Sequence, residues 1–92
     1  MPAADFETFL NSVKSESFSD GKMEKVRMVS KTARFSCEQA GRLLDALSFD
    51  SDKIDMAVLL HPTLVDAHNF YQVLDHLGFD SSKNDVRSRL GL

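Results

Sequence analysis

Apolar residues recur along the chain at intervals of three and four positions, which places their side chains on one face of an α-helix. The first stripe consists of Phe6, Phe9, Leu10 and Val13. Later stripes predict helices over 22–30, 36–47, 51–60 and 66–77, with a shorter sixth helix after Asp80. No segment alternates apolar and polar residues convincingly, as a half-buried strand would. The pattern therefore predicts an all-α fold, a compact bundle of about six helices.

Several residues predict where these helices begin and end. Ser36 is followed three positions later by Gln39, the spacing of a capping box at a helix N-terminus. The dipeptide His61-Pro62 predicts the end of the fourth helix, because the residue before a proline avoids helical geometry. Asp66 is expected to cap the fifth helix and Gly78 to close it.

A short polar segment with a central phenylalanine occurs three times between helices. It reads "SFSDGK" at 17–22, "SFDSDK" at 48–53 and "GFDSSK" at 78–83, with the phenylalanines 31 and 30 positions apart. We call these segments joints. The spacing predicts three helix–joint–helix repeats of roughly 5–31, 36–61 and 66–90 within a single helical domain spanning 1–92. One such pair cannot bury its own apolar face, so three pairs are about the minimum for a stable stack.

The joints have a structural interpretation in the sequence. We expect Phe18, Phe49 and Phe79 to be buried where two helices meet, in the manner of a hydrophobic staple. Asp50 and Asp80 are expected to cap the helices that follow them, with Ser19 or Asp20 in the first joint.

Composition limits the class of protein. The 92 residues carry a net charge of −3, which argues against general nucleic-acid binding. No apolar run approaches the ~18 residues of a membrane span, and the N-terminus lacks the basic and apolar segments of a signal peptide. The only cysteine, Cys37, allows no internal disulfide and fits a reducing compartment. We therefore expect a soluble, cytoplasmic protein.

The chain also resembles a known family. The joints and the segment "DAHNFY" at 66–71 are similar to those of domain-of-unknown-function family 4476, and the likeness extends from Phe6 to about Leu90. The resemblance implies a compact helical domain without assigned catalytic residues, found in bacterial secreted or envelope proteins and in some eukaryotic ones. The bacterial members usually follow a signal peptide. None is visible here, so the comparison favours an intracellular setting.

The residues offer little chemistry of their own. Three aspartates crowd the second joint, but the spacing after Asp50 misses the oxygen ligands and glycine of a calcium loop. Cys37 follows a helix cap, where a thiol pKa can be lowered, yet no histidine lies within 20 positions of it and free cysteines are more often buried. One cysteine and three scattered histidines offer no close pair of zinc ligands. We expect no enzyme activity, no cofactor and no bound metal.

Charge and loop position suggest where a partner would bind. Residues 22–34 hold five basic residues and one acid, a net charge of +4, whereas 45–66 holds five aspartates and one lysine, a net charge of −4. The candidate contacts are Arg27, Lys31 and Arg34 in the basic stretch and His61, Asp66, His68 and Tyr71 in the longest interruption between helices. The alternative is an ordinary solvated surface, with Asp66 as a cap and Tyr71 half-buried in the core.

These observations favour a non-catalytic protein-interaction or scaffolding module. Its partner would be an unidentified protein, and the basic stretch would attract an acidic segment. The charge asymmetry also fits head-to-tail self-association. The alternative function is a small-ligand or metal-responsive domain that uses the aspartate-rich joint or Cys37.

Overall fold

The computed structural model describes all 92 residues and contains six α-helices and no strands, which confirms the all-α prediction. The α-helices are α1 (Ala3–Lys14), α2 (Ser19–Ser30), α3 (Cys37–Asp45), α4 (Asp50–Leu60), α5 (Phe70–Leu74) and α6 (Asp80–Leu90). Two short 3-10 helices, η1 (His61–Thr63) and η2 (Ala67–Asn69), lie between α4 and α5.

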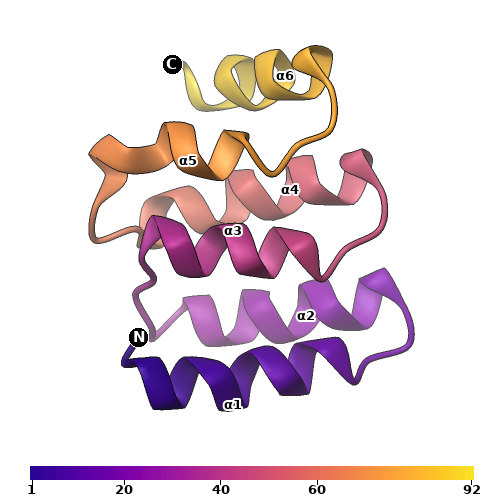
Figure 1. Cartoon of the computed structure of the whole chain (residues 1–92), viewed down its shortest axis with the longest axis vertical. Coiled ribbons are helices and arrows are strands. Elements are labelled where there is room, and N and C mark those ends of the chain that lie inside the picture. Colours follow the sequence, from indigo (N-terminus) through magenta and orange to yellow (C-terminus); the bar gives the residue numbers. More distant parts are fainter.

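The helices form two layers. Odd-numbered helices contact one another in the order α1, α3, α5, and even-numbered helices in the order α2, α4, α6 (Figure 1). The three joints lie along one edge of the molecule, on the right in Figure 1, and the connections α2–α3 and α4–α5 lie along the opposite edge. The division into three sequence repeats stays a prediction, although this placement agrees with it.

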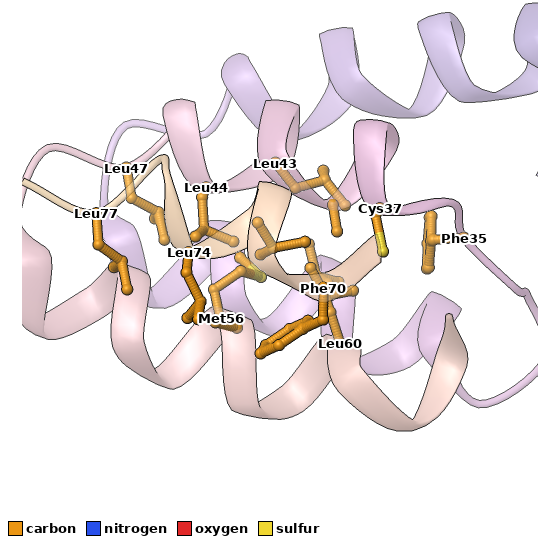
Figure 2. Packing of buried hydrophobic residues seen from close by; sticks show 14 of the residues in the cluster. Phe35, Cys37, Leu43, Leu44, Leu47, Met56, Leu60, Phe70, Leu74 and Leu77 are labelled. Atoms are coloured by element: carbon orange, nitrogen blue, oxygen red, sulfur yellow. The ribbon is translucent and has the colours of Figure 1, made fainter. Parts of the chain in front are cut away.

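Apolar stripes from both layers meet in one core. Phe6, Leu10 and Val13 of α1 are buried, as their spacing predicts. Side chains from α3, α4 and α5 converge in Figure 2, where Leu44 and Met56 lie close to Leu74 and Phe70. Burial of these side chains provides most of the favourable free energy of folding, because each is removed from water on the helix face that carries it.

Two predicted helix boundaries are confirmed. The Ser36 hydroxyl accepts a hydrogen bond of 3.1 Å from the Gln39 amide, and the Gln39 carboxamide oxygen accepts one of 3.0 Å from the Ser36 amide. This reciprocal pair is the predicted capping box. Helix α4 ends at Leu60, immediately before His61-Pro62, but His61 itself has helical backbone angles (φ −51°, ψ −46°) and begins η1, so the expected avoidance of helical geometry before the proline is wrong.

Other boundaries differ from the prediction. Helix α2 begins at Ser19 rather than at Lys22. Helix α5 is short, because Asp66 has non-helical backbone angles and the chain first forms η2. Gly78 does not close it: α5 ends at Leu74, and the only positive φ angle in the chain is that of Gly91.

The connections between the helix pairs also contact each other. Phe35 donates a backbone hydrogen bond of 3.1 Å to the Thr63 carbonyl and accepts one of 2.9 Å from the Val65 amide. These bonds form an isolated parallel bridge between Phe35 and Leu64. Segments about 30 residues apart are thereby held side by side at the edge opposite the joints, with the Phe35 ring fully buried.

Candidate functional site

The joint phenylalanines are exposed, so the prediction that they are buried is wrong. Phe18, Phe49 and Phe79 expose 79%, 69% and 67% of their surface. Each is itself the N-cap residue, with an extended backbone, whereas a hydrophobic staple uses the residue before the cap. Leu47 and Leu77, two positions before the second and third phenylalanines, are buried in their place. We call the row of three exposed rings the joint edge.

The aspartates of the joints do not cap the helices that follow them, contrary to prediction. Helices α4 and α6 have no side-chain cap, because their N-cap residues are phenylalanines. The Asp50 carboxylate instead accepts hydrogen bonds of 3.0 and 3.1 Å from the Gly78 amide and one of 2.7 Å from the Ser82 hydroxyl. Asp80, at the equivalent position in the last joint, is almost fully exposed.

These contacts shift the ionisation of Asp50. The Ser82 hydroxyl and the Gly78 amide donate to its charged form, and they lower the pKa of the Asp50 carboxyl. Asp50 is therefore ionised at neutral pH and ties the second joint to the third.

Lysines at the end of the first two joints make a second set of contacts between layers. Lys22 donates to the Ala46 carbonyl at 2.7 Å, and Lys53 lies 3.5 Å from the His76 carbonyl. Ala46 directly follows α3 and His76 lies two residues after α5, where backbone carbonyls lack helical partners. Asp50, Lys22 and Lys53 thus make their contacts inside the molecule, and the phenylalanine rings are left outside.

Two depressions adjoin the joint edge. The smaller, of about 220 Å³, lies between the first two joints and is lined by Phe18 and Phe49 together with Lys22 and Leu47. The larger, of about 590 Å³, crosses α2, α4 and α6. We call it the even-helix groove, and it is lined by Asp20, Met23, Glu24, Arg27, Asp52, Asp55, Val58 and Arg89.

Ion pairs occupy part of the even-helix groove. Arg27 pairs with Glu24, and Arg89 pairs with Asp55 at 3.0 Å. Asp20 and Asp52 also line the groove and make no ion pair. The charges left without a partner there are carboxylates.

The structure separates the basic residues that the sequence had grouped as a partner site. Arg27 lies in the even-helix groove, whereas Arg34 donates at 3.0 Å to the Pro62 carbonyl at the opposite edge. Lys31 is exposed and is the only basic residue of 22–34 without a hydrogen bond or ion pair. The fold therefore brings Arg34 to the 61–66 segment but does not bring Arg27 there.

The loop that contains the other candidates is partly structural. His61 packs edge-on against Phe70 with 4.8 Å between ring centroids. Asp66 was expected to cap the fifth helix, and that prediction is wrong. Its carboxylate instead accepts hydrogen bonds of 2.8 Å from the Cys37 amide and 3.3 Å from the Asn69 side chain. His68 is exposed. Tyr71 is 61% exposed, so the alternative that placed it half-buried in the core is wrong, and its role as a partner contact stays a prediction.

Cys37 is a buried hydrophobic residue with a weakly acidic thiol. Its sulfur lies 3.2 Å from the Asp66 carbonyl. Burial, together with the neighbouring Asp66, raises the pKa of the Cys37 thiol to about 12. The same contacts act oppositely on Asp66, whose carboxyl pKa is lowered chiefly by the hydrogen bond from the Cys37 amide. At neutral pH the thiol is therefore protonated and a poor nucleophile.

No group of three histidine, cysteine or acidic side chains has the arrangement needed to hold a metal ion. No helix is both long enough and apolar enough to cross a bilayer. The expected cytoplasmic location stays a prediction.

The sequence contained a signal for the exposed joint edge. At helical spacing from Phe49 lie Asp45, Ala46, Asp52 and Lys53, so this ring belongs to no apolar stripe. An aromatic residue outside every stripe, repeated three times, indicates exposure rather than packing.

The fold and this surface define a small all-helical domain with an aromatic edge. The chain belongs to the family described as "Domain of unknown function (DUF4476)", whose model matches residues 1–90. No curated protein and no solved structure matches the chain.

Proposed function

We propose that this domain is a non-catalytic protein-interaction module and that the joint edge is its contact surface. One observation carries the proposal: Phe18, Phe49 and Phe79 are 67–79% exposed and are the N-cap residues of α2, α4 and α6. A single exposed apolar side chain is ordinary on a protein surface. Three exposed aromatic side chains at the same position of successive even-numbered helices are unusual, and aromatic residues are enriched where proteins bind one another.

The rigidity of the joint edge supports a binding role. The bonds from Asp50 to Gly78 and Ser82 fix the third joint against the second, and Lys22 fixes the first against α3. A surface already held in one arrangement loses less conformational entropy when a partner binds. Local side-chain contacts thus favour recognition without a large rearrangement.

The chemistry of Cys37 supports the non-catalytic part of the proposal. A nucleophilic cysteine needs a lowered pKa, and the pKa of this thiol is raised to about 12. The metal-responsive alternative is less favoured, because the Asp50 oxygens already accept hydrogen bonds from Gly78 and Ser82. The even-helix groove has the volume of a small-ligand site, but six of its eight lining residues are charged, whereas ligand pockets are mostly apolar.

Photo-crosslinking tests the contact surface. Benzoylphenylalanine would replace Phe49 in one variant and Tyr71 in a matched control, since Tyr71 is a similarly exposed aromatic residue outside the joint edge. In source cells we expect a discrete crosslinked protein from position 49 and none from position 71. The same crosslinked species should disappear when Phe18 and Phe79 are also changed to serine. Equal crosslinking from both positions would overturn the proposal.

A further inference from the structure

We propose that the occupant of the joint edge is a basic amphipathic helix of a partner protein, with apolar side chains seven residues apart. This inference rests on the function proposed above and adds the chemical class of the partner. It follows from the spacing of the three rings and from the charges left free beside them.

The spacing of the rings selects a helix. Phe18, Phe49 and Phe79 are the N-cap residues of α2, α4 and α6, and adjacent helices of this layer are in contact. Packed helices lie about 8–10 Å apart, so we expect the N-cap residues that carry successive rings to be about that far apart. Seven residues of an α-helix rise about 10.5 Å, with the two side chains on nearly the same face. Same-face side chains of an extended strand are about 6.7 Å or 13 Å apart, which fits less well.

The free charges at the joint edge select a basic partner. Asp20 and Asp52 follow the first two phenylalanines closely and make no ion pair, and Asp80 meets only Lys83, at 3.9 Å. The lysines of the first two joints point at backbone carbonyls of the next layer. The depression between the first two rings contains the charge of Lys22, whereas Asp20 and Asp52 line the even-helix groove beside them. A partner helix that lies toward this groove meets the unpaired carboxylates, and lysine or arginine residues on that flank of its apolar stripe complement them.

A second copy of the chain exposes no apolar stripe that matches the spacing of the rings. The large apolar side chains that the molecule exposes are Phe18, Met28, Phe49, Val65, Tyr71, Phe79 and Leu92. No two of them are seven residues apart. We therefore assign the matching stripe to another protein.

Three synthetic helical peptides test the inference on the intact protein. The first carries leucines at positions 4, 11 and 18, flanked by lysines in an alanine and glutamine background. The second carries the same residues with leucines at positions 4, 8 and 12, which keeps one apolar face but shortens the spacing. The third keeps the first spacing and replaces lysine with glutamate. Binding is measured by fluorescence anisotropy, and the surface is mapped by amide chemical-shift changes.

We expect the first peptide to bind about tenfold more tightly than either of the others, since the second loses the matched apolar contacts, the third loses several exposed ion pairs, and each loss is worth about that ratio. Phe49→Ser should weaken its binding and Tyr71→Ser should not. Chemical-shift changes should centre on 17–22, 48–53 and 78–83. Equal binding of the three peptides, or shifts centred elsewhere, would overturn the inference.

Further outcomes separate this inference from the proposed function. Failure of all three peptides, with position-49 crosslinking intact, overturns the helical partner and leaves the interaction module standing. Cosedimentation with phosphatidylcholine vesicles that Phe49→Ser abolishes would replace the protein partner with a membrane surface. A dimer in sedimentation velocity that the same substitution dissociates would replace it with a second copy.

Discussion

The carboxylate of Asp66 accepts a 2.8 Å hydrogen bond from the backbone amide of Cys37. A side chain from the α4–α5 connection thus bonds an amide at the N-terminus of α3. The Cys37 amide is one of the first N–H groups of α3, which have no partner within the helix. Ser36 and Gln39 satisfy two other amides at this terminus. A residue 29 positions away thus completes the cap.

Replacing Asp66 with alanine should lower the free energy of unfolding by about 1 kcal/mol, the usual cost of losing a cap. Urea denaturation measures the change. Asp75→Ala is the matched control, since Asp75 is exposed and its side chain makes no hydrogen bond or ion pair. A loss no greater than that of the control would show that the cap contributes little.

The contribution of Asp66 should also depend on pH. Its pKa in the folded protein lies below its ordinary value of 3.8, so the native state binds the proton less tightly than the unfolded chain does. The stabilisation is therefore complete above about pH 5, a unit above the ordinary pKa, and is lost as pH falls through the folded pKa. The difference in unfolding free energy between wild type and Asp66→Asn should shrink as pH falls below about 5.

Asp50 and Asp80 occupy equivalent joint positions but should respond differently to mutation. Asp50→Asn weakens the acceptor for the Gly78 amide and the Ser82 hydroxyl, so we expect a lower urea midpoint. Asp80→Asn is the control, since its exposed carboxylate has only the distant Lys83. In a double-mutant cycle, Ser82→Ala should cost less in the Asp50→Asn background than in wild type. Additive effects would contradict a direct bond.

How much of this structure the sequence predicts depends on how far apart in the chain the interacting residues lie. Local signals succeeded: the stripe of Phe6, Leu10 and Val13 is buried, and the capping box at Ser36 forms. Asp66 was correctly identified as a capping residue by type, but its helix was wrong, because a side chain with a free acceptor bonds whichever amide the tertiary fold brings within reach. The bridge of Phe35 to the 63–65 segment had no local signal at all.

The candidate site was less predictable than the fold for a related reason. Charge counts along the chain treated Lys22 and Arg34 as free, whereas the fold pairs both with distant carbonyls. Whether a residue beside a helix N-terminus is buried depends on the direction of the backbone there. Phe49 was expected one position before the N-cap, in the core, but it is the N-cap residue and its side chain is exposed. Composition cannot resolve that difference.

Gly41 should resist substitution because of a single neighbour. A methyl group there would lie 2.6 and 2.9 Å from Cδ2 and Cε1 of His76, whose ring is held by Asp45. Gly41→Ala should therefore destabilise the protein despite the higher helix propensity of alanine. In a His76→Ala background the clash is absent, and the same change should stabilise it by about 1 kcal/mol. Thermal denaturation of the wild type, the two single variants and the double variant measures this reversal. If Gly41→Ala changes the stability in the same direction in both backgrounds, the clash with His76 is excluded.

The Cys37 thiol should react slowly with a thiol reagent such as Ellman's reagent at pH 8. Its pKa of about 12 keeps it protonated, and burial limits access to it. An exposed cysteine introduced by Ser81→Cys in a Cys37→Ala background should react at least about a hundredfold faster, since an ordinary thiol has a pKa near 8.5. Full unfolding in urea should remove the difference. Fast labelling of the native thiol would reopen a nucleophilic role for it.

Removing the rings of the joint edge should leave the fold almost as stable as before. Phe49 exposes most of its surface in the free protein, so Phe49→Ser should change the free energy of unfolding by no more than about 0.5 kcal/mol. Phe35→Ala is the contrast, because Phe35 is fully buried between Phe6 and Phe9 and its loss should cost about 3–5 kcal/mol. Circular-dichroism melts distinguish these values, since 1 kcal/mol shifts Tm by about 4–8 °C in a domain of this size. A large loss from Phe49→Ser would mean that the ring stabilises the folded chain, and the reason for assigning it to a partner would disappear.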